Sequence, residues 1–172
     1  MFDIKAKKDE RVQLFLSKLS KGTYSMNVPE KTKEVTSIHA NRMIHTLSKK
    51  DLLGSQKAIL DCIVENQMNR ARLVTIKMEC VRKMNTLQEK LEILSSYLKE
   101  KFAAQLRLEY SSNTAKNDAI KELFSDAYSM MLQIQGLDKL IDIVILDIDN
   151  AGWAMKNIVE VLKITAAKVN EI

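Results

Sequence analysis

Turn-forming residues are scarce in this sequence. Its 172 residues include only 4 glycines and 1 proline. A β or α/β protein of this length needs many more of them for its turns. The hydrophobic fraction of 46% is too high for a disordered chain, while aromatic residues make up only 5%. We therefore predict an all-α fold made of long helices that pack together.

Cysteines and long apolar runs are few as well. The two cysteines, Cys62 and Cys80, lie about 27 Å apart if they share one helix, which is beyond the reach of a disulfide. No CxxC or CxxH spacing is present, which argues against a zinc site. The N-terminus is charged and lacks the apolar core of a signal peptide, and no run of about 18 apolar residues is present. We expect a soluble, cytoplasmic protein that does not cross a membrane.

Catalytic motifs are also missing. The two histidines, His39 and His45, are six residues apart and do not share one helix face, and no glycine-rich phosphate loop is present. The most enzyme-like feature is an acidic set that alternates with Ile and Val, which indicates either a solvated face or pairing with basic neighbours. This set comprises Asp138, Asp142, Asp147 and Asp149. We predict no enzyme activity, no metal and no cofactor.

Apolar periodicity divides the chain into four expected helices. Two short ones, over 6–20 and 29–48, form a basic N-terminal helical arm over 1–50, and they must dock on another element or stay mobile because neither is stable alone. Two long ones, over 51–110 and 117–168, are expected to form an antiparallel helical hairpin within 51–172. This second region is also expected to oligomerise.

Heptad repeats support the two long helices. One track of the last helix repeats every seven residues: Ile120, Ala127, Ile134, Ile141, Ile148, Met155 and Leu162. Neighbouring tracks widen its apolar face beyond what a single partner helix covers. The preceding helix carries a coiled-coil seam with alternating steps of four and three: Cys80, Met84, Leu87, Leu91, Leu94 and Leu98. Upstream, Met68, Leu73 and Ile76 are expected to continue this seam.

The charge is unevenly distributed, with a basic front and an acidic back, which indicates either an anionic partner or head-to-tail attraction between protomers. The first 50 residues carry 11 Lys or Arg against 5 Asp or Glu, whereas residues 111–172 carry 6 against 9. Near the end of the third helix, Lys99, Lys101 and Arg107 lie beside Phe102 and Tyr110. Cations next to aromatic rings suit single-stranded nucleic acid, which offers phosphates and stacking bases. Alternatively, Phe102 belongs to the core and Tyr110 makes a contact at the helix end.

Three segments resemble the UvsY-like family of phage recombination mediators, over roughly residues 98–162. They are "LRLEYSS" (106–112), "AIKELFSDAYSMMLQIQGLDKLIDIV" (119–144) and "ILDIDNAGWAMKNIVEV" (145–161). The last is similar to a closing family pattern of Gly, aromatic, Ala, aliphatic, Lys, any residue and Ile. The family has basic residues at two positions where this chain has Gln105 and Ala151.

The resemblance implies a specific function. Such proteins bind single-stranded DNA as ring-like homo-oligomers, help displace the single-strand-binding protein and load a RecA-type recombinase, without catalysis or a cofactor. Arg107 is the DNA contact that the resemblance carries over, and Lys99, Lys101 and Tyr110 are added from charge and stacking. A phage origin, and with it the host cytoplasm, also rests on the resemblance.

The same C-terminal segment is predicted to build the oligomer. Ile148 and Met155 share one heptad position, and Gly152 borders their face, where a missing side chain permits close helix approach. Trp153, the only tryptophan, falls on the opposite side. We predict that it packs against a second chain or against the N-terminal helices.

Two other functions are compatible with the sequence. A structural or adaptor coiled-coil protein would bind protein partners only, and would pair its basic residues with Glu92, Glu100 and Glu109 of the same helix. Binding to a membrane surface through the basic N-terminus is a weaker alternative, because the first helix has only four strong apolar positions.

Overall fold

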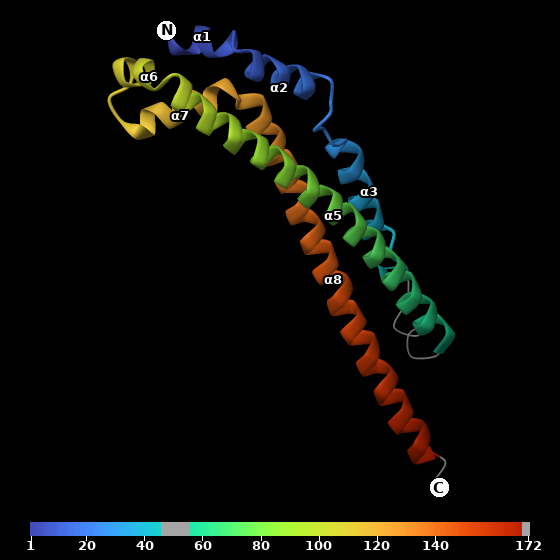
Figure 1. Ribbon diagram of the computed structural model, residues 1–172. Coiled ribbons are helices and arrows are strands. Elements are labelled where there is room, and N and C mark those ends of the chain that lie inside the picture. Colours follow the sequence, from blue (N-terminus) through green and yellow to red (C-terminus); the bar gives the residue numbers. More distant parts are fainter. Residues whose placement is uncertain (46–55, 170–172) are drawn as a thin grey trace. The chain divides into compact units, whose positions relative to one another are not determined.

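The chain is all-helical, as predicted from its composition. A computed structural model describes residues 1–45 and 56–169, and no strand occurs within these ranges. The helices are α1 (Phe2–Lys7), α2 (Glu10–Ser20), α3 (Val28–Ala40), the 3-10 turn η1 (Met43–His45), α5 (Gln56–Lys101), α6 (Ala103–Glu109), α7 (Asn113–Leu123) and α8 (Ser125–Val169) (Figure 1). Within the described residues, no helix is long and apolar enough to cross a membrane.

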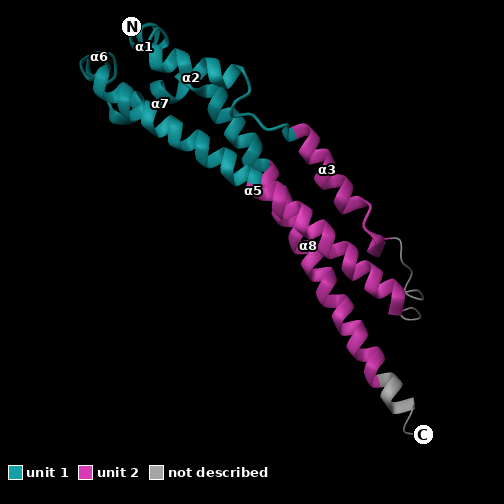
Figure 2. Cartoon of the chain, turned by 45° about the vertical axis from the view of Figure 1, so that its right-hand side comes forward, with its two compact units in different colours: residues 1–28, 79–136 teal, residues 29–78, 137–172 magenta. Residues whose placement is uncertain are grey.

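The described helices group into two compact units. Unit 1 comprises residues 1–28 and 79–136, and unit 2 comprises residues 29–78 and 137–172 (Figure 2). This division differs from the expected boundary at residue 50. The N-terminal segments are too short to bury a core of their own, and each unit therefore combines one of them with stretches of the long helices α5 and α8.

The N-terminal helices dock on the rest of the chain and contribute to its core. Phe2, Val12 and Phe15 are buried in unit 1, and Val35 of α3 is buried in unit 2. The expected single helix over 6–20 is divided between α1 and α2. At Asp9 the backbone is extended and the carboxylate accepts hydrogen bonds from the first free N–H groups of α2, as an N-cap does.

Phenylalanines interrupt the two predicted long helices. Phe102 separates α5 from α6, and Phe124 separates α7 from α8. Each ring meets an N-terminal phenylalanine edge to face: the Phe2–Phe102 centroids are 5.8 Å apart and the Phe15–Phe124 centroids 5.6 Å. Neither break was predicted, because the sequence places no glycine or proline there. The other expected helix ends, Ser48 and Asp51, lie outside the described residues.

The predicted heptad tracks form the core. In α7 and α8 the buried residues of the seven-residue track are Ile120, Ala127, Ile134, Ile141, Ile148 and Met155. In α5 the buried seam residues include Cys80, Leu87, Leu91, Leu94 and Leu98. One upstream assignment was wrong: Met68 is 69% exposed, and Asn66 is buried instead. Asn66 lies seven residues before Leu73 and therefore occupies the same heptad position. The predicted seam residue, Met68, lies two residues further along the chain.

Candidate nucleic-acid interface

Lys99 and Arg107 lie together on unit 1 and share a groove with a third cation. Lys99 of α5, Arg107 of α6 and Lys116 of α7 line a hollow of about 420 Å³, together with the side-chain amides of Asn113 and Asn117. We call this hollow the basic groove. Its remaining described lining residues are the apolar Ala103 and Leu106, so its described lining contains no carboxylate.

The turn between α6 and α7 builds this groove. Leu106 of α6 is buried. The helix ends after Glu109, and the backbone of the next residue, Tyr110, is extended. Ser112 caps the next helix, since its hydroxyl oxygen accepts a hydrogen bond of 3.0 Å from the Ala115 N–H. This cap starts α7 at Asn113, and Lys116 in its first turn thus reaches the groove that Arg107 lines.

The cations of the groove are available to an anion. Lys99 and Arg107 are exposed and, within the described residues, neither forms an ion pair with the glutamates that the adaptor alternative requires. One of these glutamates, Glu109, is engaged elsewhere: both its oxygens accept the Phe2 N–H at 2.9 Å. That hydrogen bond holds the pKa of Glu109 below its usual value. Three cations and two amides match the acceptors of a phosphate group.

Lys101 was expected in the same interface, but it serves a buried carboxylate. Its ammonium donates a hydrogen bond of 2.6 Å to Asp9, and the Tyr97 hydroxyl donates one of 2.9 Å to the same oxygen. The Asp9 side chain is 1% exposed. Burial raises the pKa of Asp9, but the hydrogen bonds from Lys101, Tyr97 and two backbone N–H groups outweigh it, so the pKa is lowered. Lys101 therefore already has an anionic partner.

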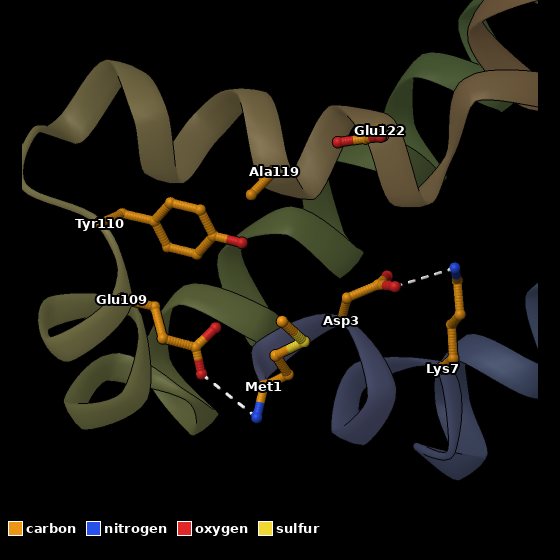
Figure 3. Close-up of a pocket in the computed structure, with 7 residues that line it drawn as sticks. All are labelled: Met1, Asp3, Lys7, Glu109, Tyr110, Ala119 and Glu122. Atoms are coloured by element: carbon orange, nitrogen blue, oxygen red, sulfur yellow. Dashed lines mark hydrogen bonds and ion pairs between the residues drawn. The ribbon is translucent and has the colours of Figure 1, made fainter.

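Tyr110 was also expected in the interface, but the structure places it elsewhere. It lines a separate cavity of about 610 Å³ that contains Asp3, Glu109 and Glu122 and also two cations, Lys7 and the Met1 ammonium, which pair with Asp3 and Glu109 (Figure 3). The Tyr110 ring lies edge to face against Phe2, with centroids 6.4 Å apart. The cations of this cavity are thus already paired with carboxylates, unlike those of the basic groove. The structure thus brings together two of the four predicted DNA-binding residues, Lys99 and Arg107, and separates Lys101 and Tyr110 from them.

Lys116 was missed in the sequence, although a signal for it was present. The segment "SSNTAKND" contains several turn and helix-capping residue types, and the sequence alone does not select one of them as the cap. With Ser112 as the cap, Lys116 falls in the first turn of the next helix, close in sequence to Arg107.

Three basic residues of α5 within unit 2 have acidic partners. Ion pairs connect Lys77 with Asp142 and Arg70 with Asp149, and Arg72 with Glu34 of α3. The interpretation that the aspartates pair with basic neighbours is therefore supported at these positions. These residues contrast with Lys99 and Arg107, whose charges have no such partners among the described residues.

The predicted oligomerisation residues fall into two groups. Ile148 and Met155 are buried inside unit 2, and Met155 packs with Ile59 and Cys62 of α5. Trp153 is 68% exposed, so the described N-terminal helices do not cover it. The expected close approach at Gly152 does not occur within the chain, because a Cβ atom there would meet no described heavy atom within 4 Å.

Comparison with known proteins identifies no relative of this chain. No protein-family model, no curated protein and no solved structure matches the chain.

Proposed function

We propose that this chain binds single-stranded DNA through the basic groove and acts as a recombination mediator. In this function it assists the loading of a RecA-type recombinase onto single-stranded DNA that single-strand-binding protein covers. The observation that supports DNA binding is the groove itself, where Lys99, Arg107 and Lys116 line one surface without a described carboxylate. The role in recombination rests on the resemblance to UvsY-like mediators.

The groove favours recognition of the DNA backbone over recognition of bases. Its described lining contains cations, amides and small apolar side chains but no aromatic ring on which a base could stack. Binding through phosphates alone is independent of base sequence and sensitive to salt. Both properties suit a protein that acts on any exposed single strand.

Self-association is part of the proposal and uses the exposed face of α8. Ile143, Leu146 and Trp153 are each more than 60% exposed, and their spacings of three and seven place them on one side of the helix. A second copy that covers this face would bury an apolar area that water otherwise contacts. The antiparallel hairpin over 51–172 would then present the same face in every copy.

The alternative function, a structural or adaptor protein that binds proteins only, also has specific support. Arg70, Arg72 and Lys77 are paired with carboxylates of the same chain, as in a protein whose charges stabilise its own fold. On this alternative, the apolar face of α8 would contact a protein partner and the basic groove would have no nucleic-acid ligand.

Fluorescence anisotropy with a labelled single-stranded oligonucleotide distinguishes the two. Three phosphate contacts per chain predict a salt slope of about −2 and a roughly 20-fold loss of affinity between about 50 and 200 mM salt. The triple variant Lys99→Ala, Arg107→Ala, Lys116→Ala is expected to lose most of the binding. Lys139→Ala, an exposed basic residue of α8 in unit 2, is the matched control and is expected to bind like the wild type.

Each possible result of this experiment supports only one of the two functions. Loss of salt-sensitive binding in the triple variant alone supports DNA binding by the groove. Absence of binding by the wild-type chain at low salt, with an oligomer still present on a sizing column, would overturn it in favour of the adaptor function. Acceleration of recombinase loading on coated single strands then tests the mediator role.

A further inference from the structure

A cluster of potential metal ligands lies in unit 2, apart from the basic groove. It consists of His39 near the end of α3, His45 in η1 and Asp147 in α8. One ligand atom from each residue lies within 4.8 Å of the other two. Residues six apart do not share one face of a helix, so the sequence alone does not predict that the two histidines meet. However, α3 ends at Ala40, and the chain then turns so that the two rings lie 5.8 Å apart.

The backbone of this turn is held in place by contacts independent of the histidines. The Met43 N–H donates a hydrogen bond of 2.7 Å to the Glu65 carboxylate of α5. Met43 and Ile44 also pack against the buried cluster that contains Met155. His45 is therefore carried by an anchored turn, and His39 and His45 both remain exposed to solvent.

The distances suit a transition-metal ion. The His39 Nε2 atom lies 3.3 Å from the Asp147 Oδ2 atom. Two ligands of a tetrahedral zinc ion, each bonded at about 2.0–2.1 Å, lie about 3.3 Å from one another. A small rotation of the His45 side chain would bring its ring nitrogen to the same separation, because all three atoms already lie within 4.8 Å.

We propose that His39, His45 and Asp147 bind one divalent transition-metal ion, with zinc as the best-suited ion. Imidazole nitrogen favours zinc, cobalt, nickel and copper over magnesium and calcium, which prefer all-oxygen sites. Water supplies the fourth ligand, because both histidines are exposed. The bound ion links the end of α3 and η1 to α8 within unit 2.

Arg42 supplies the outer contact that such a carboxylate ligand commonly has. Its side chain is 1% exposed and its guanidinium pairs with the Asp147 Oδ2 atom. A hydrogen-bonded second partner fixes the orientation of a ligating carboxylate. The Arg42 charge also weakens the attraction between Asp147 and a cation, so we expect reversible binding rather than a permanently held ion.

Calorimetric titration of the untagged, chelator-treated full chain with zinc chloride tests this site. We expect one zinc per chain in the wild type and a rise in melting temperature on zinc addition. His39→Ala and His45→Ala should each weaken binding by more than the roughly 10- to 100-fold that loss of an outer-shell partner costs. Asp142→Asn, which removes an exposed carboxylate from the same helix, is the matched control and should bind zinc normally.

Three further measurements make the result decisive. Circular dichroism checks that the histidine variants keep their helices. Cobalt titration should give the visible absorption of a four-coordinate site in the wild type only, and excess magnesium should not displace zinc. Equal zinc binding by the wild type and the His39→Ala, His45→Ala double variant, or no saturable binding at all, would overturn the proposal.

Discussion

The rings of Phe15 and Phe124 lie edge to face in unit 1, with centroids 5.6 Å apart and an interplanar angle of 90°. Phe15 belongs to the short helix α2, and Phe124 marks the break between α7 and α8. Both side chains are buried. The contact explains how the weakly apolar helix α2 stays docked. Its side chain Phe15 packs against Phe124 at the break between α7 and α8.

Removal of this side chain should strongly destabilise the protein. Phe15→Ala leaves a cavity in the core and is expected to lower the free energy of unfolding by about 3–5 kcal/mol. Leu14→Ala is the control, because Leu14 is 58% exposed and should change it by less than about 0.5 kcal/mol. Urea denaturation followed by circular dichroism measures both. Equal midpoints would show that α2 does not contribute to the cooperative core.

Asp9 should make stability depend on acid pH. Its pKa is lower in the folded protein than in the unfolded chain, so its contribution is fully present above the unfolded value of about 3.9. The contribution is lost as the pH falls through the folded pKa. Melting temperatures of the wild type and Asp9→Asn should therefore differ most near neutral pH and converge below about pH 4. A constant difference across this range would contradict the assignment.

The two lysines of α7 should differ in DNA binding. Lys116 lines the basic groove, while Lys121 is exposed in the last turn of the same helix and does not line it. Lys116→Ala should reduce the magnitude of the salt slope for single-stranded DNA by about 0.7, the value for one phosphate contact. Lys121→Ala removes the same charge and should leave the slope unchanged. Anisotropy titrations at several salt concentrations compare them, and identical slopes would count against the groove.

Asn66 should be a position where an apolar residue increases stability. It is 4% exposed, and neither polar atom of its side chain has a hydrogen-bond partner within the described residues. A buried unpaired amide costs roughly 1–3 kcal/mol, and Asn66→Leu should recover part of this while it matches Ile59 and Leu73 in heptad position. Thermal unfolding at low protein concentration provides the test. A lower melting temperature for Asn66→Leu would show that the amide has a partner in solution.

Sequence periodicity predicted the core better than it predicted the helix ends. The seven-residue track through Ile134, Ile141 and Ile148 is buried because its spacing matches one face of a helix whatever the chain does elsewhere. The breaks at Phe102 and Phe124 arise from tertiary contacts with N-terminal rings, and phenylalanine has no helix-breaking propensity to signal them.

In the candidate sites, too, the sequence predicts residues that lie close together in the chain but not contacts between distant ones. Arg107 is predicted from the family resemblance and Lys99 from charge, and the structure places both on one groove. Lys101 could not be separated from them, because its partner Asp9 lies 92 residues earlier in the chain. The histidine cluster was missed for a related reason: its third member, Asp147, comes from another helix, and its two histidines meet only because α3 ends between them.

The two ion pairs between α5 and α8 in unit 2 carry positional information. Lys77 pairs with Asp142 and Arg70 with Asp149, so seven residues backward on one helix match seven forward on the other. A heptad seam alone tolerates sliding by one repeat, since apolar residues would again face apolar residues. Such a slip would break both pairs and would place only one of the two cations opposite an aspartate again, either Lys77 opposite Asp149 or Arg70 opposite Asp142. The two ion pairs thus specify one register of the two helices among those that the heptad repeat allows.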